Sequence, residues 1–210
     1  MFIYIVVLLT VTSFGCADTS HKEPFITPDL AEYVRDKCIE IVSNETRQLQ
    51  VMQMYACGMK FNELKTGKDY YRFYCGEKMG EQCSEIIVSY YVDCLNSEEQ
   101  YLSKFFTSSF QNAMKHFCGI EDVVSKFESI INIDCIRNEE WHNLLAVCLN
   151  NAFKIDDRNK FVLSHSLVCG QLPELKICFE EAVQLKCKSS LLDDVINDIF
   201  TPFVEWCNLN

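Results

Sequence analysis

Four histidines are the first residues to test for catalytic chemistry: His21, His116, His142 and His165. None stands in the pattern of a zinc protease, a serine hydrolase or a phosphate-binding loop. Glu139 and His142 form an E-x-x-H, half of the dimetal signature of helical bundles, but the sequence has no second copy. We therefore expect no catalytic residue, no metal site and no cofactor.

Cysteine is the other residue type that carries chemistry, with 13 copies among 210 residues. An even set at long, irregular spacing forms disulfides in an oxidising compartment, whereas zinc sites need paired C-x-x-C or histidine ligands that are absent here. Twelve cysteines, without Cys16, predict six disulfides: Cys38, Cys57, Cys75, Cys83, Cys94, Cys118, Cys135, Cys148, Cys169, Cys178, Cys187 and Cys207. Their spacing leaves the connectivity open.

The amino terminus predicts the compartment. Residues 2–11 are an uncharged apolar run, followed by Gly15-Cys16-Ala17, a small-x-small pattern suited to signal peptidase. Cleavage after Ala17 leaves an even cysteine count, and cleavage after Gly15 leaves an odd one. We expect a signal peptide over 1–17 and a secreted, extracellular protein. No later apolar run is long enough to span a bilayer, so no membrane association is expected.

Charge and glycosylation signals agree with that compartment. The formal net charge is -11 and no basic run is present, which opposes binding to a phosphate backbone, so nucleic acid is excluded as a partner. Asn44-Glu45-Thr46 is the one glycosylation sequon with a permitted middle residue. We expect Asn44 to carry a glycan, the alternative being an unmodified N-cap of the helix from Thr46.

The elements that must position these residues are helices. Thr27 and Pro28 form a helix start before an apolar stripe that reaches Ile41, and Ser97–Gln100 form a capping box before a stripe over 102–117. Further apolar stripes follow at 49–57, 70–74, 120–131, 141–149, 175–183 and 192–200. Residues 85–92 are rich in strand formers, and we interpret them as a buried helix. The fold class is all-α, a disulfide-rich helical bundle.

Glycine and proline mark where we expect these helices to end or begin. Four glycines directly follow a cysteine, and we expect each to end a helix in the left-handed conformation: Gly58, Gly76, Gly119 and Gly170. Pro173 is expected to open a helix, and Pro202 to kink or end the last one.

Helical spacing also restricts the disulfides. Cys83 and Cys94 lie about 16 Å apart on one helix, too far for a bond. The same argument holds for Cys178 and Cys187. The bridges should therefore join one helix to another.

The cysteine ladder suggests two tandem six-cysteine helical units, at 18–118 and 119–210. Successive separations are 19, 18, 8, 11 and 24 in the first unit, against 13, 21, 9, 9 and 20 in the second. A true repeat predicts bonds that mostly stay within each unit. The alternative is one large helical domain with independently placed cysteines.

The tyrosines of the mature chain all lie in the first unit. They could line a cavity for an apolar small-molecule ligand, or they could be core and protein-contact residues.

One family resembles this pattern. The order Tyr74-Cys75, Cys83, Cys94-Leu95-Asn96-Ser97-Glu98-Glu99-Gln100, Phe117-Cys118 and the ladder from Cys135 to Cys207 is similar to the insect 27 kDa haemolymph glycoproteins. The resemblance covers essentially the whole mature chain. It implies an all-helical, secreted and glycosylated protein without an established molecular function. The chain departs from the pattern by its single sequon and its tyrosine content.

Three hypotheses follow. The leading one is a non-enzymatic, disulfide-stapled haemolymph or body-fluid glycoprotein. The second is an extracellular carrier of a lipid or other apolar ligand. The third and least favoured is a secreted hydrolase that uses His116, His142 or His165.

Overall fold

The computed structural model describes residues 33, 37, 44–137, 139–155 and 160–209, and the secondary structure within these ranges is helical throughout. The α-helices are α3 (Asn44–Asn62), α4 (Gly67–Tyr71), α5 (Met79–Val92), α6 (Tyr101–Cys118), α7 (Val123–Ile131), α8 (Glu139–Ala152), α9 (His165–Lys186) and α10 (Ser190–Leu209). Short turns of other helical types are η2 (Arg72–Gly76, π), η3 (Ser97–Glu99, 3-10) and η4 (Asp134–Arg137, 3-10). The predicted all-α, disulfide-rich fold is therefore confirmed, and so is the helical interpretation of residues 85–92, which lie in α5.

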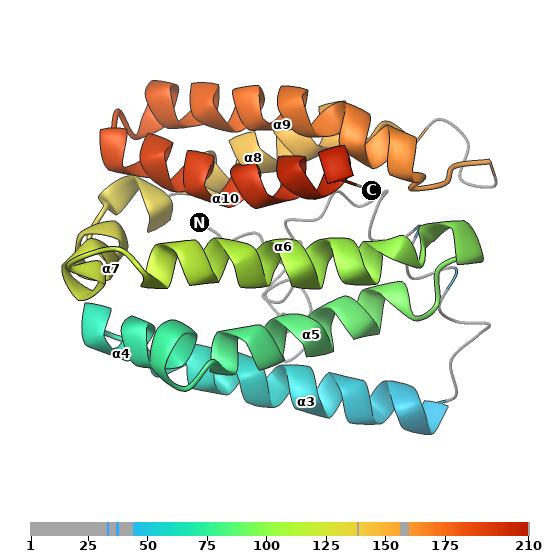
Figure 1. The fold of residues 1–210 in the computed structure, drawn as a ribbon, viewed down its shortest axis with the longest axis horizontal. Coiled ribbons are helices and arrows are strands. Elements are labelled where there is room, and N and C mark those ends of the chain that lie inside the picture. Colours follow the sequence, from blue (N-terminus) through green and yellow to red (C-terminus); the bar gives the residue numbers. More distant parts are fainter. Residues whose placement is uncertain (1–32, 34–36, 38–43, 138, 156–159, 210) are drawn as a thin grey trace.

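Helix α6 lies in the middle of the molecule (Figure 1). It packs against α5 on one side and against α10 on the other, while α9 lies beyond α10 and α3 lies beyond α5. This position agrees with its sequence, because its large apolar residues Leu102, Phe105 and Phe110 are all at most 2% exposed. α7 lies at one end of the bundle and packs against α4.

The described core is one contiguous cluster that draws on both six-cysteine units. Phe105 and Phe117 from the first unit belong to the same cluster as Trp141, Phe179 and Phe200 from the second. The two units are thus joined by a shared apolar interior, which burial from water stabilises.

Five disulfides are described, and each joins two different helical elements. The bonds are Cys57–Cys83 (α3 to α5), Cys75–Cys118 (η2 to α6), Cys135–Cys187 (η4 to the end of α9), Cys148–Cys178 (α8 to α9) and Cys169–Cys207 (α9 to α10). The expectations that Cys83 does not bond Cys94, and that Cys178 does not bond Cys187, are confirmed. Cys94 is also disulfide-bonded, and Cys38 lies outside the described residues.

Two of the described bonds of each unit connect the same cysteine positions as in the other unit. In each unit the second cysteine bonds the fourth and the third bonds the sixth. All five described bonds stay within one unit, as the repeat predicts. The exact boundaries of the units, 18–118 and 119–210, remain a prediction.

The predicted left-handed glycines are wrong. No described glycine has a positive φ; the left-handed residues are Lys78, Asp122 and Lys188. α3 continues past Gly58 to Asn62, and Gly170 lies inside α9. α6 does end before Gly119, but that glycine has φ -83°. A left-handed glycine therefore does not end any of these helices.

Pro173 does not open a helix, and Pro202 does not end the last one. α9 begins eight residues before Pro173, and α10 continues through Pro202 to Leu209. A proline inside a helix loses one backbone hydrogen bond. Around Pro202 the helix is held by packing, since Phe200 and Phe203 are buried, and by the bond of Cys207 to Cys169.

The capping box before α6 is displaced by one residue from its predicted place. The cap residue is Asn96 rather than Ser97, and its partner is the Glu99 carboxylate, which accepts a hydrogen bond from the Asn96 backbone N–H at 3.0 Å. The box therefore opens the short turn η3, and α6 follows.

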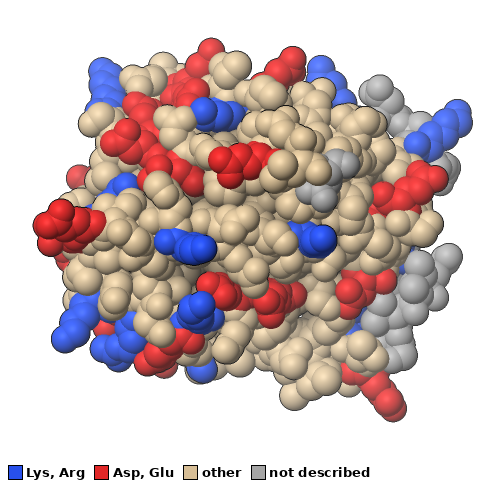
Figure 2. Space-filling view, in the orientation of Figure 1, with Lys and Arg blue, Asp and Glu red and all other residues tan. Residues whose placement is uncertain are grey.

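Acidic and basic side chains are interspersed over the face seen in Figure 2, without a continuous basic stripe. Among the described helices, none combines the length and apolar character that a membrane crossing requires.

Candidate functional site

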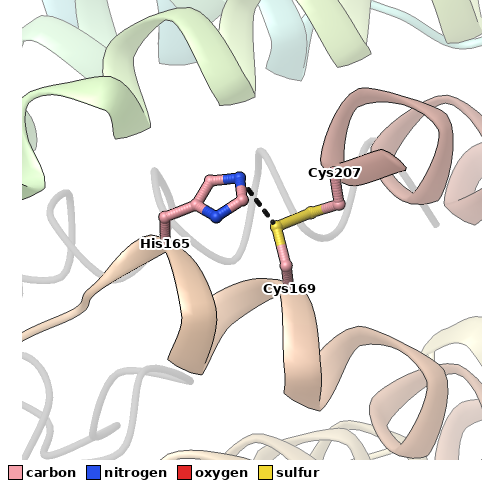
Figure 3. A group of neighbouring side chains, drawn as sticks. All are labelled: His165, Cys169 and Cys207. Carbon is pink, nitrogen blue, oxygen red and sulfur yellow. Dashed lines mark hydrogen bonds between the residues drawn. A yellow bond between two sulfur atoms is a disulfide. The ribbon is translucent and has the colours of Figure 1, made fainter. Parts of the chain in front are cut away.

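A histidine and a disulfide meet where α9 begins and α10 ends. Ser164 caps α9 by accepting a hydrogen bond from the Leu167 backbone N–H at 3.3 Å. His165 is the first residue of the helix, so Cys169 lies one turn later on the same face. The last turn of α10 brings Cys207 to Cys169, and the two sulfurs are bonded (Figure 3).

The imidazole of His165 points at this disulfide. Its Nε2 lies 3.4 Å from Sγ of Cys169. A disulfide sulfur carries no hydrogen, so the contact is a hydrogen bond when Nε2 carries the proton and the sulfur accepts it. His165, Cys169 and Cys207 are all half-buried.

Two aromatic rings hold the imidazole in place. The His165 ring centroid lies 5.5 Å from that of Tyr101 and 5.6 Å from that of Trp206. Tyr101 is itself anchored, because its hydroxyl donates to the Leu163 carbonyl at 3.0 Å. The histidine is therefore oriented toward the sulfur by neighbours from α6 and α10.

Among the described residues, the same three side chains also lie close enough together for their ligand atoms to share a metal ion. One ligand atom from each of His165, Cys169 and Cys207 lies within 4.8 Å of the others. Thiolate is the form of cysteine that binds metals, and both sulfurs here are committed to a disulfide. The oxidised site is thus a disulfide with a histidine neighbour.

Of the other histidines, the structure describes the side chain of His116 alone, and it lies away from His165. The side chain of His116 is 64% exposed, and its Nε2 lies 3.5 Å from Asp198 on α10, which also pairs with Lys126. That is a surface contact with a carboxylate and not a nucleophile with its base. His142 lies in α8, but its side chain and that of Glu139 fall outside the described residues, as does the whole of His21.

The predicted glycosylation site begins α3. Asn44 is the first residue of this helix, and its side chain also lies outside the description. Glycosylation at Asn44 remains a prediction.

A second polar site is the buried carboxylate of Glu99, which has no exposed surface. It accepts hydrogen bonds from Lys37 Nζ at 2.8 Å, from the Leu163 backbone N–H at 2.9 Å and from the Tyr33 hydroxyl. Burial raises the pKa of Glu99, but these bonds and the one from Asn96 outweigh it, and the pKa lies below the usual carboxyl range. These partners come from segments that are far apart in the chain, so the hydrogen bonds of Glu99 hold those segments together.

The tyrosines of the first unit pack mainly against other rings. Tyr74 is buried between Phe73 and Phe127, and Tyr70 packs against Phe61 and Phe127. Burial raises the pKa of Tyr74 above its usual range. These contacts favour the core interpretation of the tyrosines over the ligand-cavity interpretation.

Sequence reasoning missed both sites. The signal for the first was present, since His165 and Cys169 are four residues apart on what folds as one helix. It was hidden by the expectation that the helix begins at Pro173. For Glu99 the sequence contains only the pattern of a capping box. That pattern is local and does not indicate the distant partners of the carboxylate.

Fold and sites together define a disulfide-rich, all-α protein. Comparisons of the chain with protein-family models, with curated proteins and with solved structures found no match. The similarity to the haemolymph glycoproteins therefore rests on the order of the cysteines and their neighbours.

Proposed function

We propose that this chain is a secreted, non-enzymatic glycoprotein of an extracellular body fluid, of the insect haemolymph kind. The observation that carries the proposal is that all eleven described cysteines are in disulfides. Disulfides persist in oxidising, extracellular compartments and are rare in the cytosol. The apolar leader and the Asn44 sequon support the same compartment.

The pattern of bonds supports a structural role for the cysteines. Each described bond joins two helical elements, and each contributes about 2–4 kcal/mol by restricting the unfolded chain. A rigid scaffold of this kind resists unfolding in a fluid that lacks the chaperones of the cell. The separation of His116 from His165, on different helices and with different partners, supports a non-enzymatic protein.

Expression of the full chain in insect cells tests the proposal. We expect the protein in the medium, with its leader removed after Ala17 and with no cysteine alkylated by iodoacetamide under denaturing, non-reducing conditions. An N-glycosidase should lower its mass, and the matched variant Asn44→Gln should show no such change. Retention of the chain inside the cells, or alkylation at several cysteines, would contradict the proposal.

A further inference from the structure

We propose that the Cys169–Cys207 bond is a thiol–disulfide exchange site, at which His165 donates a proton to the departing sulfur of Cys169. The partner is a reducing thiol or dithiol. This inference goes beyond the proposed function, because it assigns reactivity to one of the bonds that the scaffold contains.

The proximity of His165 to Cys169 distinguishes this bond. A disulfide exchanges faster when the leaving sulfur is stabilised as it departs. Nε2 of His165 is 3.4 Å from the Cys169 sulfur and is held there by Tyr101 and Trp206. The proton donor is thus already placed before any thiol arrives.

The first unit contains a matched bond without this donor. Cys75–Cys118 also joins the third and sixth cysteines of its unit, and both of its residues are half-buried. Four residues before Cys75 stands Tyr71 instead of a histidine, and Cys75 lies in the π-helical turn η2. Because the two bonds are similarly exposed to an external thiol, a difference between their reduction rates reflects His165 more than exposure.

Two of the other bonds are less open to attack than Cys169–Cys207. Cys57–Cys83 and Cys148–Cys178 each contain a buried residue, Cys83 at 7% and Cys148 at 3% exposure. Arg47 Nη1 lies 3.7 Å from the Cys94 sulfur, but Cys94 is fully buried and a guanidinium does not give up its proton. At Cys169–Cys207, both cysteines are half-buried and His165 lies beside one of the sulfurs as a proton donor.

The exchange balances in two steps. An external thiolate attacks Sγ of Cys207, a new sulfur–sulfur bond forms there, and the Cys169–Cys207 bond breaks. The electron pair leaves with Sγ of Cys169, which takes the proton from Nε2 of the imidazolium form of His165 and becomes a thiol, leaving the imidazole neutral. When the reagent is a dithiol, its second thiol then attacks the reagent's own sulfur in the mixed disulfide with Cys207. The reagent leaves as a cyclic or linked disulfide, and Cys207 becomes a thiol. Two electrons have then passed from the reagent to the protein.

The first arm of the experiment uses the unaltered protein from the medium. It is exposed to dithiothreitol at pH 7 for increasing times, quenched with acid, alkylated and mapped by peptide mass spectrometry. We expect Cys169–Cys207 to open first, at about ten times the rate of Cys75–Cys118. We expect a rate ratio smaller than the roughly hundredfold acceleration that a general acid gives, because a thiolate is a weaker base than the leaving groups that need such an acid most. If another bond opens first, the proposal fails, and this result needs no variant.

Two variants separate proton donation from packing. His165→Gln keeps an N–H that can hydrogen-bond the sulfur but cannot transfer its proton, and His165→Ala removes the side chain. We expect both to slow the opening of Cys169–Cys207 about tenfold and to leave Cys75–Cys118 unchanged, with free imidazole restoring part of the rate of His165→Ala. A wild-type rate for His165→Gln would overturn the role of the histidine. Free cysteines before any thiol is added would instead contradict the proposed function.

Discussion

At the scale of single residues, the carboxylate of Glu99 shows how one buried charge can organise distant parts of the chain. It binds Tyr33 and Lys37 from the amino-terminal side, the Asn96 backbone beside it, and the Leu163 backbone from the segment before α9. A buried charge without partners would be costly, so these hydrogen bonds are needed for the fold. The same segment before α9 also supports His165.

Replacing this carboxylate should change both stability and its dependence on pH. Because the pKa of Glu99 is lowered in the folded protein, its contribution is complete above the unfolded pKa, near 4.3, and is lost as pH falls through the folded pKa. We expect Glu99→Gln to lower the free energy of unfolding by about 1–3 kcal/mol at pH 7. The difference between variant and native protein should shrink below about pH 4.

Urea unfolding followed by circular dichroism at pH 7 and pH 3 measures this effect. The matched control is Glu98→Gln, because Glu98 is the exposed neighbour of Glu99. The control should unfold within about 0.5 kcal/mol of the native protein. An equal loss in both variants, or a loss that grows at low pH, would show that Glu99 does not act as described.

At the scale of elements, the contact between α4 and α7 depends on a glycine at the start of α4. A Cβ built on Gly67 would lie 2.3 Å from the Val124 carbonyl oxygen and 2.7 Å from the Glu128 backbone nitrogen. The Gly67 N–H donates to the Glu128 carboxylate at 2.5 Å. Here glycine permits close approach of two backbones, one from each six-cysteine unit.

We expect Gly67→Ala to push α4 and α7 apart. Backbone atoms cannot move aside as the end of a flexible side chain can, so the free energy of unfolding should fall by about 1–3 kcal/mol. Amide hydrogen exchange should become faster in α4 and α7 and stay unchanged in α8. Gly76→Ala is the control, since a Cβ at Gly76 has no neighbour closer than 4.0 Å. Unchanged exchange in α4 and α7 would refute the close contact.

At the scale of the whole molecule, covalent bonds and packing divide the chain differently. The five described disulfides stay within one six-cysteine unit or the other. The core, by contrast, crosses between the units where α6 packs on α10 and α4 packs on α7. The described disulfides therefore link residues within each unit, whereas the apolar core joins the two units.

Cutting the chain between α6 and α7 tests this difference. A protease site introduced at residues 119–122, which lie between these helices, should allow one cleavage. After cleavage, size-exclusion chromatography in native buffer should give one peak at the intact mass. A non-reducing denaturing gel should give two fragments, because no described bond links them. A single band on that gel would reveal a bond between the units.

The sequence alone determined the features that depend on near neighbours. Apolar stripes at helical spacing predict α6, α7, α8 and α10, and the spacing of Cys83 and Cys94 excludes a bond between them. These inferences succeed because a helix repeats every 3.6 residues, so a local pattern decides which side chains share a face. The disulfide-bonded state of the eleven described cysteines was predicted separately, from the even number and irregular spacing of the cysteines.

Only the tertiary structure decided where helices end and which distant groups meet. α9 begins well before Pro173 and α10 passes through Pro202, because packing and the Cys169–Cys207 bond outweigh the local cost of proline. The choice of Cys207 as the partner of Cys169, and of Lys37 as the partner of Glu99, depends on how whole helices dock. Docking follows from the shared core, to which residues far apart in the chain contribute together, and no short stretch of sequence contains that information.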